Sequence, residues 1–140
     1  MIEPGDLDVG RAWATASLRI ASDQLSTEAI SERLGLRPTS TRSAEGEPAF
    51  SVWVRASGLE PSASIEDHLY ILIEELRDHS RALVELCECS TVEVWLSFSA
   101  AAGSRRPSVV DHGALAELGQ MGIDLVLDPY PAEGRPLRAG

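Results

Sequence analysis

Four segments of the chain alternate apolar and polar residues with a period of two, which is typical of strands with one buried face. They span residues 13–22, 50–57, 91–99 and 123–130. In the first of them, Leu18 and Ile20 fall on one side and Ser17 and Arg19 on the other. Strands covered by helices on both faces are instead apolar almost continuously. The alternation therefore argues against a doubly wound parallel sheet and predicts a sheet with one open face.

Stretches with helical periodicity separate these segments. Ser26 predicts the N-cap of a short helix, and Gly35 is placed to end it. A second apolar stripe begins at Ile65 and continues weakly to Cys87, with "RDHSR" interrupting it. It predicts either one long helix or two helices in series. Asp111 predicts the N-cap of a last helix before the final strand.

The simplest fold packs every helical stripe against one face of the sheet. We expect an α+β two-layer sandwich of ferredoxin-like type, with about four strands in a mixed or antiparallel sheet. A single domain should cover residues 13–130, with a flexible N-terminal segment at 1–12 and a flexible tail at 131–140. The central hairpin of ferredoxin-like folds has no counterpart among these strands. The strand order therefore stays open, and so do extra short strands in the polar loop 37–48 or around residues 108–110.

All three tryptophans of the chain fall on the predicted open face. Trp53 in "SVWVR" and Trp95 in "VEVWLSF" each lie on the polar side of their strand. Aromatic and arginine side chains are enriched where protein interfaces carry their binding energy. The candidate interface residues are Trp13, Arg19, Trp53, Arg55, Glu93 and Trp95. The alternative is that a terminal segment, a loop or a dimer covers these tryptophans, since cross-strand aromatic pairs also stabilise sheets without a ligand.

The formal net charge is −10, from 22 acidic against 12 basic side chains. This charge disfavours nucleic acid and anionic lipid as partners and favours a basic one. The first ten residues have neither the basic nor the apolar region of a secretory signal, and no apolar run is long enough to span a membrane. We expect a cytoplasmic protein that binds a protein partner or forms a homo-oligomer.

No motif in the sequence identifies a reaction, so we expect no catalytic residues, no metal and no cofactor. His68 and His79 are three helical turns apart, about 16 Å along an axis, which is too far to share one metal ion. Cys87 and Cys89 lack the common C-x-x-C spacing of metal and redox sites. Asp111 and His112 are neighbours in sequence, and such neighbours rarely point at each other as a catalytic pair does. An anion-binding site is the remaining chemical hypothesis, with loop arginines near a helix end: Arg42, Arg105 and Arg106.

The order of several motifs resembles a bacterial family, domain of unknown function 4279. The motifs are the strand "ASLRI", the helix exit Leu-Gly-x-x-Pro, the tryptophan strand "SVWV", and the final strand Gly-Ile-x-Leu-x-Leu-x-x-Tyr. The resemblance covers about residues 14 to 130. It implies a small α+β domain and supplies no catalytic residues, because the family has no established function.

Together these patterns favour a non-enzymatic protein-binding module that uses the open sheet face. Small acidic bacterial domains of this kind are often immunity proteins, and an acidic chain suits neutralisation of a basic nuclease toxin. The alternative is a small-molecule or anion-binding sensor or enzyme that uses the loop arginines at a helix end.

Overall fold

The computed structural model describes residues 12–46, 49–99 and 107–131. Five strands form one sheet in the order β2-β3-β1-β4-β5. Their bounds are β1 Trp13–Ser22, β2 Ser40–Ala44, β3 Phe50–Ala56, β4 Thr91–Ser99 and β5 Asp124–Tyr130. The strand β1 is central and pairs antiparallel with both β3 and β4, whereas β5 runs parallel to β4. The sheet is therefore mixed, as expected, with one strand more than the four segments predicted.

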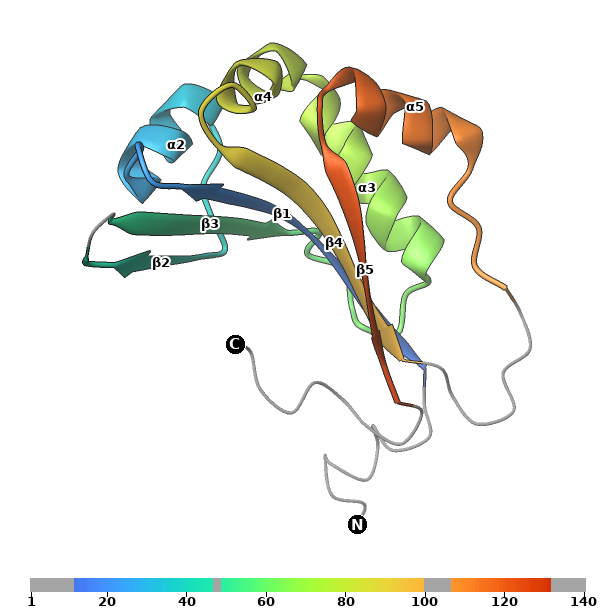
Figure 1. The fold of residues 1–140 in the computed structure, drawn as a ribbon. Coiled ribbons are helices and arrows are strands. Elements are labelled where there is room, and N and C mark those ends of the chain that lie inside the picture. The colour runs from blue at the N-terminus through green and yellow to red at the C-terminus, as the bar shows by residue number, and fades with distance from the viewer. Residues whose placement is uncertain (1–11, 47–48, 100–106, 132–140) are drawn as a thin grey trace.

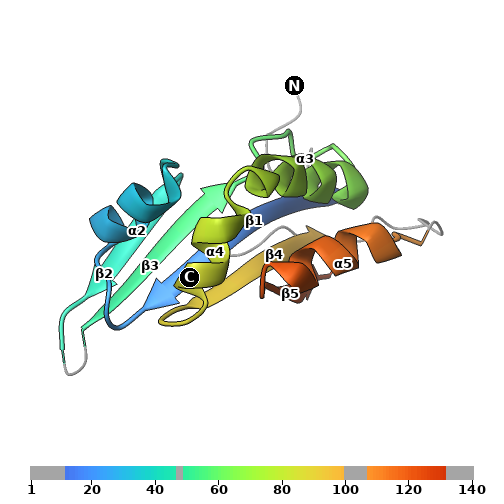
Figure 2. The same cartoon turned by 90° about the horizontal axis from the view of Figure 1, so that it is seen from above.

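Four helices in the described residues lie on one face of the sheet, and Figures 1 and 2 show this layer from the side and from above. They are α2 Thr27–Leu34, α3 Ile65–Arg77, α4 Ser80–Leu86 and α5 His112–Gln120. The α+β two-layer sandwich is thus confirmed. None of these helices is long and apolar enough to cross a membrane.

The connectivity explains why helices separate strands that pair antiparallel. The path β1–α2–β2–β3–α3–α4–β4 is a βαββαβ unit, in which two strands joined through a helix have a third strand between them. The hairpin missing from the sequence-based prediction is β2–β3, since β2 forms in the polar stretch that read as a loop. The parallel pair β4–β5 is joined through α5, as a crossover connection requires.

The helix boundaries follow from side chains identified in the sequence. Ser26 Oγ and Asp111 Oδ1 accept hydrogen bonds from backbone N–H groups in the first turns of α2 and α5. Gly35 ends α2 with φ +73°, a left-handed conformation that favours glycine. His79 separates α3 from α4, and its Nδ1 lies 2.7 Å from the carbonyl oxygen of Leu34. The interrupted stripe is therefore two helices in series.

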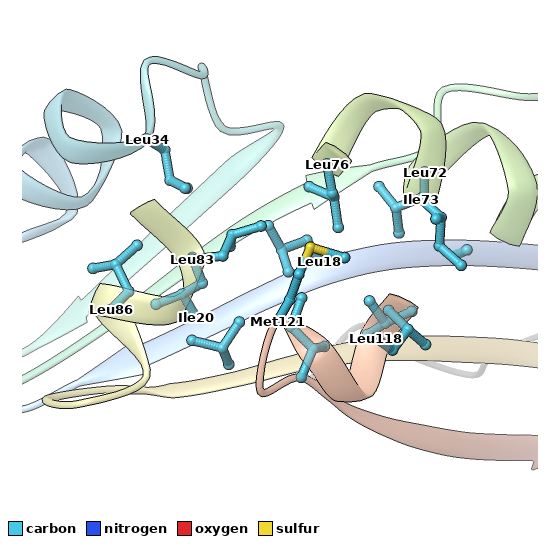
Figure 3. Close-up of a cluster of buried hydrophobic side chains, with 14 of the residues drawn as sticks. Leu18, Ile20, Leu34, Leu72, Ile73, Leu76, Leu83, Leu86, Leu118 and Met121 are labelled. Carbon is cyan, nitrogen blue, oxygen red and sulfur yellow. The ribbon is translucent and has the colours of Figure 1, made fainter. Parts of the chain in front are cut away.

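The hydrophobic core lies between the helix layer and the sheet. Figure 3 shows side chains from β1, α2, α3, α4 and α5 converging there. Leu18 and Ile20 of β1 are 0% exposed, and Leu72 and Leu76 of α3 pack above the sheet with similar burial. These residues are the apolar sides of the strand and helix patterns, so burial of the predicted stripes builds this core.

The expected orientation of the second strand is wrong. Cross-strand pairs place Trp53 opposite Ile20 and Arg55 opposite Leu18, so both side chains lie on the helix-covered face. Trp53 is 0% exposed, and its Nε1 donates a hydrogen bond of 2.8 Å to Ser31 Oγ on α2. The two valines of the strand occupy the open face instead.

The polar neighbours of Trp53 led to the wrong predicted orientation, because Arg55 has a partner in the helix layer. Its guanidinium forms a two-bond ion pair with Glu75 of α3, at 2.6 and 2.9 Å, and also donates to the Arg37 carbonyl. This pairing raises the pKa of Arg55 and lowers that of Glu75. An arginine with such a partner can lie beside the core, so its presence does not mark a solvent-facing side.

Some predictions fall on residues that the structure does not describe. The two flexible termini lie almost entirely outside the described residues, and so do Arg105 and Arg106. Between residues 12 and 131, apart from those gaps, no three His, Cys, Asp or Glu side chains come together in a way that could hold a metal ion.

Candidate protein interface on the open sheet face

We call the side of the sheet opposite the helices the open face. No described helix or strand covers it (Figure 1). The strand registers assign alternate residues to this face. Those used below are Trp13, Thr15, Ser17 and Arg19 of β1, Arg42 of β2, Val52 and Val54 of β3, Glu93, Trp95 and Ser97 of β4, and Asp124, Val126, Asp128 and Tyr130 of β5.

An aromatic pair lies at one end of the open face. The register aligns Trp13, Ser99 and Tyr130 in one row across three strands. The rings of Trp13 and Tyr130 have their centroids 5.3 Å apart and are tilted by 47°. This distance and tilt lie within the favourable range for aromatic pairs. Ser99, between them in this row, is 5% exposed.

A carboxylate lies in the next row of the same face. Thr15, Ser97 and Asp128 are aligned there across β1, β4 and β5. The Ser97 hydroxyl donates to Asp128 Oδ2 at 2.9 Å, and the Tyr130 hydroxyl donates to the same oxygen at 3.1 Å. Burial, followed by the hydrogen bond to Asp128, raises the pKa of Tyr130 above its ordinary value. Two hydroxyl groups thus hold this carboxylate in one orientation.

A second aromatic group lies further along β4. The guanidinium carbon of Arg19 is 4.0 Å above the Trp95 ring, and Trp95 Nε1 donates to Glu93 Oε1 at 3.0 Å. The Nε of Arg19 is buried without a hydrogen-bond partner, so stacking on the indole is the interaction that holds this guanidinium. Trp95 is consequently fixed by neighbours on two sides while remaining partly exposed.

Negative charge gathers on the β4–β5 half of the open face. Glu93 and Asp124 are aligned neighbours, and Asp128 follows four residues along β5. The two ion pairs within the described residues, Arg55–Glu75 and Arg77–Glu117, belong to the helix side. The three carboxylates therefore have no ion-pair partner in the described part of the chain. A basic group from another molecule would complement them.

The structure brings together four of the six predicted interface residues. Trp13, Arg19, Glu93 and Trp95 share the open face, whereas Trp53 and Arg55 lie on the other side of the sheet. Arg42 lies on the open face of the edge strand β2.

Neither Asp128 nor Tyr130 was singled out from the sequence as a candidate site residue. The alternation of the final strand places Asp124, Asp128 and Tyr130 on one side, because they are separated by even numbers of residues. Tyr130 was not considered because Pro129 precedes it and because it lies at the end of the strand. Tyr130 nevertheless contacts both the aromatic ring of Trp13 and the carboxylate of Asp128.

A hollow of about 480 Å³ lies on the helix side, between the end of α2 and the start of α4. Its walls carry both basic and acidic side chains, with Arg33 and Arg81 facing it together with Asp78 and Glu85. Of the arginines predicted to bind an anion, Arg42 lies within the described residues, and it is not among the residues that line this hollow.

A serine–histidine pair is present but is enclosed. The Ser57 hydroxyl lies 2.6 Å from His68 Nδ1, and His68 Nε2 lies 3.0 Å from the Glu60 carbonyl oxygen. Since a carbonyl only accepts, Nε2 carries the proton and Nδ1 accepts from Ser57. His68 is 0% exposed, and burial lowers its pKa. The pair ties the loop after β3 to α3, and the imidazole is closed to solvent.

Comparison with known proteins identifies a family for the chain but no individual related protein. A model of the family described as "Domain of unknown function (DUF4279)" matches residues 12–132. No curated protein and no solved structure matches the chain. Because the match spans most of the chain and includes every described strand and helix, the chain belongs to the DUF4279 family of domains of unknown function.

Proposed function

We propose that this protein is a non-enzymatic binding module that holds a basic protein partner on its open face. The observation that carries the proposal is the combination of aromatic side chains with carboxylates that form no ion pair among the described residues, on a side of β4 and β5 that no described helix or strand covers. Protein interfaces are enriched in such aromatic groups, and complementary charge speeds association and selects partners.

The open face is large enough for a specific contact. The central strand β1 has 10 residues, which corresponds to about 33 Å, and five strands spaced by about 4.8 Å span about 19 Å. The flat area is therefore roughly 600 Å², before side-chain relief is counted. Standard interfaces bury about 800 Å² on each partner, and weaker ones bury less. The face alone supports a complex in the lower part of this range.

The edges of the sheet are poorly suited to the same task. The β5 edge carries Asp124, Asp128 and Pro129, and every residue of β2 is exposed, with polar side chains along most of its length. Charged residues and proline on edge strands prevent pairing with another strand. A partner is therefore better accommodated by the side chains of the face than by strand addition.

A second copy of the chain fits the open face less well than a basic protein. Two copies meeting through this face would bring Glu93, Asp124 and Asp128 of each near the other, and each chain has a net charge of −10. Like charges facing each other across an interface cost several kcal/mol. The charge pattern thus favours a hetero-complex over a homo-oligomer.

The concrete form of the proposal is an immunity protein that acts in the cytoplasm and neutralises a basic toxin such as a nuclease. The support for this form is the acidity of the chain and an analogy with other small acidic bacterial domains. Cell fractionation tests the location. Relief of growth arrest on co-expression with a toxin encoded by the neighbouring gene tests the role.

The contact surface is tested by capture from the source organism at physiological salt with three tagged forms: wild type, Trp95→Ser and Tyr70→Ser. Tyr70 is the matched control, because it is an aromatic residue 57% exposed on the outer side of the helix layer. We expect one basic protein to be retained by wild type and Tyr70→Ser and lost with Trp95→Ser, with cross-links to β4 and β5. A partner retained equally by all three forms would contradict this use of the face.

The second candidate function, binding of an anionic small molecule, has its support in the hollow on the helix side. Arg33, His79 and Arg81 line it, although Asp78 and Glu85 offset their charge. A phosphate-induced rise in melting temperature that Arg81→Ala abolishes, while Trp95→Ser preserves it, would favour this function over protein binding.

A further inference from the structure

We propose that Asp128, Trp13 and Tyr130 form a subsite for one arginine side chain of the partner. This inference rests on the proposed function and specifies it, because it assigns the basic group that the open face recognises. The subsite lies at the end of the face where β1, β4 and β5 run side by side.

The carboxylate of the subsite has one oxygen engaged and one available. Both hydroxyl donors, Ser97 and Tyr130, bind Asp128 Oδ2. Within the described residues, Oδ1 takes no hydrogen bond, and the carboxylate makes no ion pair. Asp128 as a whole residue is partly buried. An incoming cation would therefore meet an oriented anion with an open acceptor, and a charge-assisted hydrogen bond is stronger than a neutral one.

Aromatic surface adjoins this carboxylate. The Tyr130 ring contacts Trp13 at 5.3 Å between centroids, while its hydroxyl reaches Asp128. The negative faces of aromatic rings attract cations placed over them, tryptophan most strongly. The subsite thus offers aromatic rings and an anion side by side.

A guanidinium matches these two features better than other cations do. It is planar and weakly hydrated, stacks on aromatic faces and donates several hydrogen bonds in one plane. The open face already holds one such group, since the Arg19 guanidinium lies 4.0 Å above Trp95. A metal ion is less suitable, because no cluster of three candidate ligands exists in the described part of the chain.

The neighbouring charges leave room for a second guanidinium. Arg19 and Arg42 are the basic residues of the described open face, and the guanidinium of Arg19, which lies two rows from Asp128, stacks on Trp95 in the row between them. Glu93 and Asp124 lie in the same row as Arg19 and offset its charge. The charge of Arg19 reaches Tyr130, where it opposes the rise in pKa, but neither Arg19 nor Arg42 forms an ion pair with Asp128.

The test is a titration of the ¹⁵N-labelled full chain with N-acetyl-arginine amide, followed by two-dimensional NMR. The neutral isostere N-acetyl-citrulline amide is the control ligand. The three tryptophans provide separate indole signals: Trp13 at the subsite, Trp95 beside it, and Trp53 in the core as an internal reference. We expect a saturable shift that is largest for the Trp13 indole and absent for Trp53, with no comparable shift for citrulline.

Matched variants on one strand separate the subsite from general acidity. Asp128→Asn should weaken binding of the arginine probe at least about 10-fold, because it removes the charge of the hydrogen-bonded acceptor. Asp124→Asn removes the same charge from the same face at the other end of β5 and should change the dissociation constant less than about twofold. Equal weakening by both variants, equal shifts with citrulline, or no saturable shift at Trp13 would each overturn the inference. The citrulline comparison uses only wild type, so it holds even if a variant fails to fold.

The failure of this inference is distinguishable from failure of the proposed function, because the titration needs no partner protein. A captured partner whose affinity Asp128→Asn leaves unchanged would overturn the arginine subsite alone. Specific binding of the arginine probe by a protein that retains no partner in the capture experiment would overturn the binding function alone.

Discussion

Replacing Trp53 with alanine tests the most consequential placement in the fold, that of a tryptophan between the sheet and α2. The side chain is 0% exposed, and its Nε1 donates to Ser31 Oγ at 2.8 Å. Truncation of a buried Trp or Phe to alanine costs about 3–5 kcal/mol, because apolar burial is lost and a cavity is left. The lost hydrogen bond falls within this range, since Ser31 is partly exposed and water replaces the donor. We therefore expect the free energy of unfolding to fall by about 3–5 kcal/mol.

Urea unfolding followed by far-UV circular dichroism measures this loss. With a slope of about 2 kcal/mol per molar urea, the midpoint should fall by about 1.5–2.5 M. Trp95→Ala is the matched control, because Trp95 is partly exposed on the open face and loses mainly its contact with Arg19. That contact corresponds to about 0.5–1 kcal/mol. The two variants should thus differ severalfold in their effect.

The reasoning fails if Trp53→Ala destabilises the protein by less than about 1 kcal/mol, or by no more than Trp95→Ala does. Either result would mean that β3 presents its tryptophan to the open face. A cycle of Trp53→Phe and Ser31→Ala then isolates the hydrogen bond, which should contribute a coupling of about 0.5–1.5 kcal/mol.

Two further predictions concern titratable groups on the helix side. Arg55 lowers the pKa of Glu75, so their ion pair stabilises the fold above the ordinary carboxylate pKa and this stabilisation is lost as pH falls through the folded value. Glu75→Gln should cost about 1 kcal/mol at neutral pH, after allowance for solvent screening, and urea midpoints that differ from wild type equally at pH 7 and about pH 3 would contradict it. Burial lowers the pKa of His68, so the unfolded chain takes up a proton more readily and stability falls as pH drops below about 6.5. His68→Gln should flatten the dependence of the urea midpoint on pH between about 7.5 and 5.5, and an unchanged slope would show that the imidazole does not titrate on unfolding.

The sequence predicts the regular parts of this fold because each pattern there has one physical cause. The alternation in β1 separates side chains that face the helices from those that do not, and Leu18 and Ile20 are buried accordingly. Helix starts at Ser26 and Asp111 follow from side-chain oxygens that satisfy free backbone N–H groups. These signals are local, so they need no knowledge of what lies nearby.

The failures concern residues whose position depends on distant partners. The orientation of β3 is set by Ser31, which accepts from Trp53, and by Glu75, which pairs with Arg55. Neither partner can be identified from the alternation of residues along a single strand. The strand β2 shows no alternation of apolar and polar residues, because Ala44 is its one apolar residue. It forms through its backbone pairing with β3. The candidate subsite was missed for the same reason, since Tyr130 acquires its role from contacts across the sheet.

The central place of β1 determines when the chain is able to fold during synthesis. β1 emerges from the ribosome first, but one of its two neighbours, β4, begins only at Thr91. At about 5–20 residues per second, the roughly 70 residues between the end of β1 and the start of β4 take roughly 3–14 s to be made. During that whole interval the edge of β1 that will pair with β4 stays unpaired, and Leu18 and Ile20 lack part of their final cover. The nascent chain is accordingly most open to chaperones, and to pairing with the wrong strand, in the seconds before β4 appears.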